Sequence, residues 1–295
     1  MPIIRKNPEC ISCIIKKYVD QYPEGISRED KIKYMERVLL AVANSDIEEA
    51  APQITEIVYQ IQREMFGSVK DLSHVKSYFN QKMLGYEDKI KKNIEKSQNS
   101  LLCALKYAMI GNFIDFGAMA KVDEDKLISL IDSCEEQNID ECAFESLKNN
   151  LEGAKNLVYL TDNCGEIVFD KAFIDEIQRQ FPSLSVTAIV RGGEVLNDCT
   201  LYDAHEVGLD KVCRVIDNGT LYAGTCLDEI SPDAKNAIDN ADLIIAKGQG
   251  NLETLQYCGL NIFYAFMCKC QMFSNKFGKP LYSGMLINDR DLPMA

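Results

Sequence analysis

Acid and amide side chains follow directly after the apolar run 157–160, in the segment 161–166 with the sequence TDNCGE. A carboxylate beside a carboxamide, here Asp162 beside Asn163, supplies two oxygen donors to a hard divalent cation without saturating it. The pattern is typical of a buried strand that ends in a loop, with a helix beginning near Glu166. Asp and Asn are also ordinary helix-capping residues, so a plain cap is the alternative to half of a metal site.

Four more apolar runs in the C-terminal half end in polar loops, most of them with glycine. The runs are 185–190, 212–216, 243–246 and 262–266, and the loops are Arg191-Gly192-Gly193 with Asn197-Asp198, Asp217-Asn218-Gly219, Lys247-Gly248-Gln249-Gly250-Asn251 and Cys268-Lys269-Cys270. Helical spacing separates the runs, and Ser231-Pro232-Asp233 is a typical helix start. This alternation predicts a mostly parallel sheet with helices on both faces. Ligands bind at the carboxyl ends of such strands.

The N-terminal third has a different pattern. The segments 31–43, 47–65 and 94–109 carry apolar residues at three- and four-residue steps, with almost no strand-like alternation. We therefore expect an all-helical region over residues 1–120, packed against an α/β/α core over residues 121–295 that carries the functional site.

Composition narrows the class of protein. A net charge of −13 disfavours a nucleic acid or an anionic membrane as partner. No apolar run approaches the ~20 residues of a membrane helix, and the N-terminus does not resemble a signal peptide. The twelve cysteines are scattered, several of them inside apolar runs. We therefore expect reduced thiols in a cytoplasmic protein.

The motif Cys10-Ile11-Ser12-Cys13 is compatible with half of a zinc site or with a redox dithiol. No second cysteine pair has ligand spacing, and His74 and His205 are isolated. The motif also opens a helix, whereas a thioredoxin-type pair follows a strand. Packing thiols are therefore the favoured interpretation of Cys10 and Cys13, and their purpose stays open.

Two glycines bracket an amide and a carboxylate in the segment 111–117, GNFIDFG. This arrangement suggests backbone close to a ligand, with Asn112 and Asp115 as polar side chains beside it. Taken alone, the segment is better explained by termination of a helix by glycine.

Taken in order, these motifs resemble the metal-dependent damage-control phosphatases. The ordered set is GNxIDxG, DNxGE, RGGxxxND, KGxxN and a late lysine, and it extends from Cys10 to about Lys269. The Cys-x-x-Cys motif resembles the short prokaryotic branch of that family. The resemblance implies a Rossmann-like three-layer α/β/α core with a helical N-terminal region. It also implies hydrolysis of small phosphorylated metabolites, such as sugar phosphates, nucleotides or damaged phosphometabolites, with a divalent metal.

The resemblance further implies roles for individual residues. The metal ligands would be Asp162, Asn163 and Asp198, Lys269 would meet the phosphate, and Asp115 would line the same pocket. Chemistry leaves the general base open between Asp115 and a metal-bound hydroxide. The substrate-binding residues would be Asn112, Glu166, Arg191, Asn197, Lys247, Gly248, Gly250 and Asn251. The chain departs from the family at Cys164, where a small residue such as alanine is expected, and at Met267-Cys268, which is usually aliphatic. It also lacks the Arg-Thr that precedes the late lysine in eukaryotic branches.

Three oxygen ligands fit this chemistry, because they leave positions for water and phosphate oxygens around Mg²⁺ or Mn²⁺, and Co²⁺ or Ni²⁺ is also possible. Such a metal polarises the phosphoryl group and lowers the pKa of bound water. Lys247 and Lys269 would offset phosphate charge, while Gly248 and Gly250 would let backbone N–H groups approach it. We expect attack by water rather than a phospho-enzyme.

Other classes were weighed against this one. A haloacid-dehalogenase-type phosphatase needs a second Asp two residues after the nucleophile, where this chain has Cys164. A dinucleotide-dependent oxidoreductase is disfavoured because Glu253 stands at the third glycine position of the motif that begins at Gly248. An S-adenosylmethionine-dependent methyltransferase and a non-catalytic phosphometabolite-binding protein remain as alternatives. The oligomeric state is left open.

Overall fold

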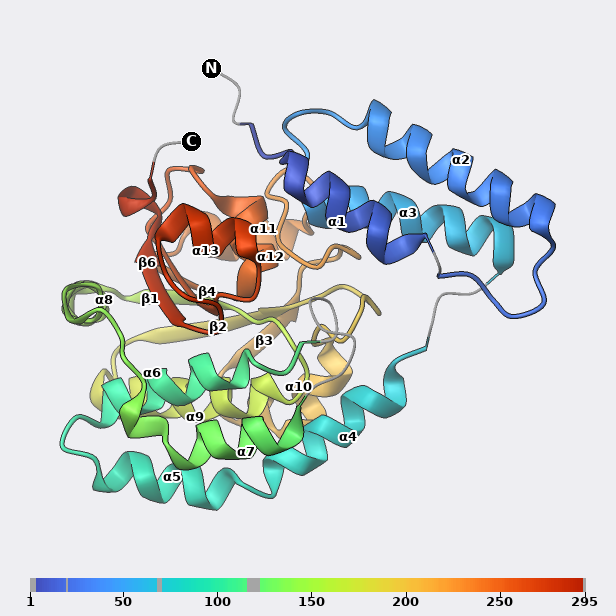
Figure 1. Cartoon of the computed structure of the whole chain (residues 1–295). Helices are drawn as coiled ribbons and strands as arrows, with labels where there is room; N and C mark the ends of the chain where they lie inside the picture. Colours follow the sequence, from blue (N-terminus) through green and yellow to red (C-terminus); the bar gives the residue numbers. More distant parts are fainter. Residues whose placement is uncertain (1–3, 20, 68–70, 116–122, 294–295) are drawn as a thin grey trace.

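The computed structural model describes residues 4–19, 21–67, 71–115 and 123–293. In this part of the chain, helices come first and strands alternate with helices afterwards (Figure 1). None of the described helices has the length and apolar character needed to span a bilayer. The helices that precede the first strand are α1 (Pro8–Tyr18), α2 (Arg28–Asn44), α3 (Ala51–Phe66), α4 (Ser73–Leu84), α5 (Glu87–Lys96), α6 (Ser100–Gly111), α7 (Glu124–Asp132) and α8 (Glu141–Gly153).

A six-stranded sheet forms the centre of the C-terminal half, with strand order β3-β2-β1-β4-β5-β6. Strands β1 to β5 are parallel, and β6 pairs antiparallel with β5. The predicted α/β fold with a mostly parallel sheet is therefore confirmed. The elements are β1 (Asn156–Leu160), α9 (Glu166–Gln180), β2 (Ser185–Val190), α10 (Leu201–Val207), β3 (Arg214–Asp217), α11 (Pro232–Asp239), β4 (Leu243–Lys247), α12 (Gly248–Leu255), β5 (Ile262–Met267), α13 (Gln271–Phe277) and β6 (Gly284–Asn288).

Alternate residues of each strand face opposite sides of the sheet, and both sides are apolar. Tyr159 and Ile245 belong to a cluster that includes residues of α6 and α9, whereas Leu160 and Ile244 belong to a cluster with residues of α11, α12 and α13. Figure 1 shows these two groups of helices on opposite faces of the sheet. The core is therefore a three-layer sandwich.

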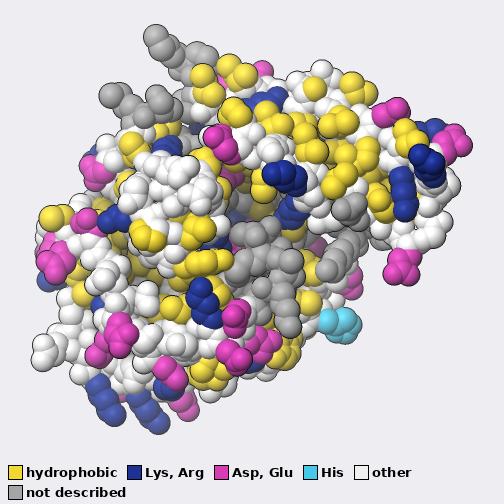
Figure 2. Space-filling view, viewed as in Figure 1, with side chains coloured by type: hydrophobic (Ala, Val, Ile, Leu, Met, Phe, Trp, Pro, Cys, Tyr) yellow, Lys and Arg dark blue, Asp and Glu magenta, His cyan; other side chains and the backbone are white. Residues whose placement is uncertain are grey.

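Helices α1 to α3 form a bundle with its own apolar cluster, centred on Tyr18, Tyr34 and Val58. We call these three helices the N-terminal bundle. In Figure 1 they lie together at the upper right, apart from α4 to α9. Hydrophobic side chains are also exposed over the bundle (Figure 2), among them Leu39 and Leu40 on α2. Helices α4 to α6 instead share the core of the sheet, and the domain division at residue 120 stays a prediction.

Two details differ from the sequence expectations. The segment 94–109 is divided between α5 and α6, because the Asn99 side chain accepts a hydrogen bond from the Leu102 N–H and caps a new helix. Strand β6 was not predicted, since it is a short edge strand with only three consecutive apolar residues.

The strand order places a topological switch point between β1 and β4. From β1 the chain moves outward through β2 and β3, whereas from β4 it moves the other way through β5. In open α/β sheets, ligands bind at such a point, beside the carboxyl ends of the strands. Asp162 follows β1 and Gly248 follows β4, so the two predicted loops flank the switch point.

Candidate active site at the switch point

The loops after β1 and β2 are joined by an antiparallel bridge between Asn163 and Asp198. The backbone N–H groups of Cys164 and Cys199 each donate to a carbonyl of the opposite loop at 2.8 Å. These hydrogen bonds flank the bridged residues, which therefore form a non-hydrogen-bonded pair with a Cα separation of about 4.5 Å. Side chains of such a pair lie close together on one face. The bridge thus brings together two predicted metal ligands from separate loops.

The carboxylates of Asp162 and Asp198 are both buried, and the Arg191 guanidinium lies between them. Arg191 Nε donates to Asp198 Oδ2 at 2.7 Å, and Nη2 faces Asp162 Oδ1 at 3.5 Å. Burial and repulsion by Asp198 raise the pKa of Asp162 well above its ordinary value, against the opposing effect of Arg191. Burial also raises the pKa of Asp198 to about 6 although Arg191 lowers it. Together the two carboxylates attract cations strongly.

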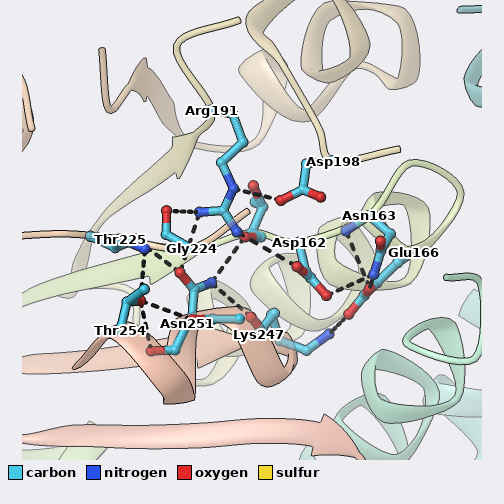
Figure 3. A network of polar contacts seen from close by, with 12 residues as sticks. Asp162, Asn163, Glu166, Arg191, Asp198, Gly224, Thr225, Lys247, Asn251 and Thr254 are labelled. Atoms are coloured by element: carbon cyan, nitrogen blue, oxygen red, sulfur yellow. Dashed lines mark hydrogen bonds and ion pairs between the residues drawn. The ribbon is translucent and has the colours of Figure 1, made fainter. Parts of the chain in front are cut away.

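Glu166 holds the amide of Asn163 (Figure 3) and the amide of Asn112 in fixed orientations. Asn163 Nδ2 donates to Asp162 Oδ2 at 2.7 Å and to Glu166 Oε2 at 2.8 Å. Its Oδ1 must then point elsewhere, and no described residue donates to it. Asn112 Nδ2 also donates to Asp162 Oδ2, at 3.0 Å, while its Oδ1 accepts the Met267 N–H at 2.9 Å. Asn163 therefore keeps a usable ligand oxygen, whereas Asn112 positions its neighbours.

Lys247 lies beneath the site and is fully buried. Its ammonium donates to the Ala108 carbonyl at 2.8 Å, to Glu166 Oε1 at 2.7 Å and to Asp170 Oδ1 at 2.6 Å. The Tyr159 hydroxyl donates to the same Asp170 oxygen at 2.7 Å. All three ammonium protons are thus used within the protein. This arrangement differs from the expected contact with phosphate and makes Lys247 the counter-charge of Glu166 and Asp170.

The two glycines of the loop after β4 permit close packing of the protein itself. A Cβ at Gly248, whose φ is +79°, would lie 2.0 Å from Asp162 Oδ2. A Cβ at Gly250 would lie 1.9 Å from the Ala223 carbonyl oxygen. The sequence suggested that both glycines admit phosphate. The structure adds a packing role for both glycines, because one seats a predicted metal ligand and the other seats a neighbouring loop.

Lys269 and the start of α12 face the same site. Lys269 Nζ donates to Asp115 Oδ2 at 2.7 Å, and its backbone N–H donates to Gln249 Oε1 at 2.7 Å. Gln249 is the second residue of α12, whose first N–H groups have no partner within the helix. A cation and a helix N-terminus, both suited to an anion, are therefore adjacent.

Asn251 helps to hold Arg191 in place (Figure 3). Arg191 Nη1 donates to the Gly224 carbonyl at 2.9 Å and to Asn251 Oδ1 at 3.3 Å. The Thr225 hydroxyl donates to Asn251 Oδ1 at 2.8 Å, and Asn251 Nδ2 donates to the Lys247 carbonyl at 2.7 Å. The sequence did not indicate that Gly224 and Thr225 belong to the site. Their only signal is that a small residue and a polar residue stand together in the loop after β3.

The remaining predicted residues also lie close to the site. Asn197 is buried, and its Nδ2 donates to the Ile114 carbonyl at 3.4 Å, which ties the loop after β2 to the segment after α6. Asp115 is near the surface, with its side chain 18% exposed. Phe116 and Gly117, the end of the glycine-bracketed motif, lie outside the described residues.

The donor set fits a hard divalent cation. Asp162 Oδ1, Asn163 Oδ1 and Asp198 Oδ1 accept no hydrogen bond from the described residues, and a carboxylate–amide set of this kind suits Mg²⁺ or Mn²⁺. Five carboxylates (Asp115, Asp162, Glu166, Asp170 and Asp198) share three cations in direct ion pairs, those of Arg191, Lys247 and Lys269. The excess of negative charge favours a bound cation.

The Cys-x-x-Cys motif lies close to this region but forms no recognisable metal centre. Burial raises the pKa of the Cys10 thiol, and Glu253, Cys270 and Cys13 add to that effect. Across the described part of the chain, no group of three or more His, Cys, Asp or Glu side chains is arranged to hold a metal ion. Every cysteine is a free thiol. The candidate site at the switch point does not contradict this finding. Two of its proposed ligands are carboxylates, whereas the third, Asn163, is an amide and does not count toward such a group.

Comparison with known proteins gives a consistent result. The family model of the damage-control phosphatase ARMT1-like domain matches residues 7–284. An uncharacterised protein of Methanocaldococcus jannaschii is 29% identical over 296 residues, 96% of this chain and 95% of that protein. A damage-control phosphatase of Archaeoglobus fulgidus is 27% identical over 92% of this chain and 95% of its own length. One from Pyrococcus horikoshii is 36% identical over 60% of this chain and 61% of its own length.

A solved structure also matches the whole fold. The crystal structure of a DUF89 family protein from Pyrococcus horikoshii superposes with a TM-score of 0.80 at 26% sequence identity. The match covers 96% of this chain and 99% of that chain.

Proposed function

Because the chain belongs to the damage-control phosphatase ARMT1-like family, we propose that it is a metal-dependent phosphatase acting on small phosphate monoesters. The observation that supports the proposal is that three residues with oxygens suited to a metal, Asp162, Asn163 and Asp198, lie on two bridged loops, with Lys269 beside the start of α12. Oxygen ligands beside an anion-binding helix end are the parts that phosphoryl transfer requires.

Asp162, Asn163 and Asp198 would hold the metal, with Mg²⁺ or Mn²⁺ favoured by the oxygen ligands and Co²⁺ or Ni²⁺ as further candidates. A bound divalent ion supplies a Lewis acid for the phosphoryl oxygens and acidifies a coordinated water. Glu166 contributes by fixing the Asn163 amide, since an amide rotated by half a turn would present its nitrogen. Arg191 holds the Asp198 carboxylate in place.

The phosphate group would bind at the first N–H groups of α12, where the helix dipole favours negative charge. Lys269 would offset charge on the transferring group, because its Nζ is already positioned by Asp115. The Asp115 carboxylate is the candidate to accept the proton of the attacking water. Sugar phosphates, nucleotides and damaged phosphometabolites are the proposed substrate classes, because each carries a terminal phosphate on a small leaving group.

The test is hydrolysis of p-nitrophenyl phosphate by chelator-stripped protein, with Mg²⁺, Mn²⁺, Co²⁺ and Ni²⁺ restored one at a time. Asp198→Ala removes a proposed ligand, and Asp239→Ala on the exposed face of α11 is the matched control. We expect metal-restored turnover that falls at least about 100-fold in Asp198→Ala and persists in Asp239→Ala. Activity that is indifferent to metal, or that survives Asp198→Ala, would contradict the proposal.

Two other functions would be recognised in the same experiment. Absence of turnover combined with calorimetric binding of S-adenosylmethionine would indicate a methyltransferase. Absence of turnover combined with tight binding of inorganic phosphate would indicate a phosphometabolite-binding protein. Either result would replace the phosphatase assignment.

A further inference from the structure

Helix α4 places two polar side chains in the interior of the protein. Lys76 and Asn80 are four residues apart, so they lie on the same face of the helix. Lys76 is 2% exposed and Asn80 is fully buried. Burial of such groups is unfavourable unless they are paired or hydrogen-bonded. Their partners therefore indicate what this face of α4 does.

Asn80 holds the loop after β1. Its Oδ1 accepts the backbone N–H of Gly165 at 2.6 Å. Gly165 has a φ of +79°, and a Cβ at this position would lie 3.0 Å from Phe79 Cβ, so α4 packs directly against the turn. The turn leads from Asn163, a proposed metal ligand, to Glu166, which orients the Asn163 amide. Asn80 thus fixes the turn that connects a ligand to its support.

Lys76 holds the loop after β2 on both sides of Asp198. Its ammonium pairs with Glu194 Oε2 at 2.6 Å and with Asp203 Oδ2 at 2.9 Å. The same Asp203 oxygen accepts the Thr200 backbone N–H at 2.9 Å and the Thr200 hydroxyl at 2.7 Å. Glu194 precedes Asp198 in the sequence, and Thr200 follows it. One ammonium therefore joins the two ends of the segment that carries a proposed metal ligand.

Helix α4 is also attached to α10, which follows directly after the second loop. Asn80 Nδ2 donates to Glu206 Oε2 at 2.6 Å, and the Ser77 hydroxyl donates to Glu206 Oε1 at 2.7 Å. Figure 1 shows α4 and α10 side by side. The acceptor of Asn80 thus holds one loop, while its donor holds the helix that begins at the end of the other. The two loops are connected through α4.

We propose that Lys76 and Asn80 are positioning residues that hold the two ligand-bearing loops at the separation needed for metal binding. The inference rests on the proposed metal-dependent function, in which Asn163 and Asp198 are ligands from separate loops. The bridge between these two residues joins the loops at their centre, whereas α4 joins them at their ends. Residues that orient metal ligands in this way change metal affinity about 10- to 100-fold when they are replaced.

The test compares Asn80→Ala and Lys76→Met with Met83→Ala. Met83 is a fully buried core residue of the same helix, so its replacement lowers stability by leaving a cavity but removes no hydrogen bond to either loop. Each chelator-stripped protein is titrated with Mg²⁺ and with Mn²⁺ by calorimetry, well below its melting temperature. Turnover of p-nitrophenyl phosphate is then measured over a range of metal concentrations.

We expect Asn80→Ala and Lys76→Met each to weaken metal binding about 10- to 100-fold. Excess metal should recover most of the lost turnover, because neither residue is itself a ligand. Met83→Ala should keep the wild-type metal affinity although its melting temperature falls. Asn80→Ala and Lys76→Met act on different loops, so either variant decides the question if the other does not fold.

Asn80→Asp separates positioning from stability. It keeps an oxygen that can accept the Gly165 N–H but places a second carboxyl group beside Glu206. We expect its melting temperature to fall while its metal affinity stays at or above the wild-type value. A loss of metal affinity as large as that of Asn80→Ala would show that the side chain acts only through stability.

The outcomes separate the two proposals. If the wild type hydrolyses the ester and both α4 variants bind metal as tightly as it does, the positioning role is wrong and the phosphatase stands. If Met83→Ala loses as much metal affinity as Asn80→Ala, the positioning role is also wrong. If the wild type binds metal without turnover, the phosphatase proposal fails, and the calorimetric comparison still decides on Lys76 and Asn80. A wild type that binds neither ion would overturn both proposals.

Discussion

Replacing Lys247 with methionine would remove the counter-charge beneath the site while keeping most of the side-chain volume. The wild-type ammonium is fully buried and donates to Ala108, Glu166 and Asp170. Burial by itself would lower its pKa, yet the two carboxylates raise it above the ordinary value. The ion pairs therefore more than offset the desolvation of the lysine. In Lys247→Met, two neighbouring buried carboxylates would have no cation.

The size of the effect follows from this arrangement. Removing one partner of a buried ion pair costs about 3–5 kcal/mol, because it leaves an uncompensated charge. We expect the free energy of unfolding to fall by about that amount at pH 8. The matched control is Lys235→Met, since Lys235 pairs with Asp239 on an exposed helix face. Exposed pairs of this kind contribute about 0.3–0.5 kcal/mol.

The assay is urea unfolding from pH 5 to pH 8, followed by circular dichroism. Burial raises the pKa of Asp170 to about 7 even with Lys247 present. A carboxyl group whose folded pKa is raised stabilises the fold at low pH and loses that contribution as pH rises through the folded pKa. Without Lys247, which lowers it, the pKa of Asp170 should rise further. The difference between wild type and Lys247→Met should therefore be small at pH 5 and largest at pH 8.

Two results would refute this reasoning. One is a loss below about 1 kcal/mol at pH 8, since that is the range of an exposed pair. The other is a loss that does not vary with pH, which would point to packing rather than charge. The double variant Lys247→Met/Asp170→Asn supplies a further check, because removing one of the two unpaired carboxylates should restore part of the lost stability.

Three further variants test the rest of the site. Gly248→Ala should weaken metal binding at least about 10-fold by calorimetry, because its Cβ would meet Asp162, and Gly278→Ala, with positive φ but open space, should not. Lys269→Ala should lower kcat/KM about 100-fold with unchanged metal affinity, and a loss of metal affinity instead would show that it serves Asp115. Asp170→Asn should remove the fall in unfolding free energy between about pH 4 and pH 7, the ordinary and the folded pKa of this group, and a fall that persists would mean that another group titrates there.

The sheet was predictable because its strands are apolar on both faces. Run 185–190 coincides with β2, and the helix expected near Glu166 begins there as α9. The antiparallel edge strand β6 escaped detection, since a five-residue strand with three consecutive apolar residues gives no periodic signal. The division between α5 and α6 was also missed, because it depends on a single cap at Asn99.

The adjacency of Asp162, Asn163 and Asp198 was predictable, because the carboxyl ends of neighbouring parallel strands meet at one edge. The structural role of Lys247 was not predictable from the sequence. Whether a lysine after a strand meets substrate or a buried carboxylate depends on partners far away in the sequence. Its ammonium contacts Asp170 and Ala108, which are 77 and 139 positions distant.

These sequence separations also affect how the protein folds during its synthesis on the ribosome. A ribosome delivers Glu166 and Asp170 before Lys247, which follows Glu166 by 81 positions. Until β4 has emerged and inserted beside β1, the growing chain has two carboxylates destined for its interior and no cation to accompany them. Native folding of α9 must therefore wait for the last third of the chain. If the proposed metal site is correct, metal binding during synthesis would report that β4 has inserted beside β1, because Gly248 after β4 seats Asp162.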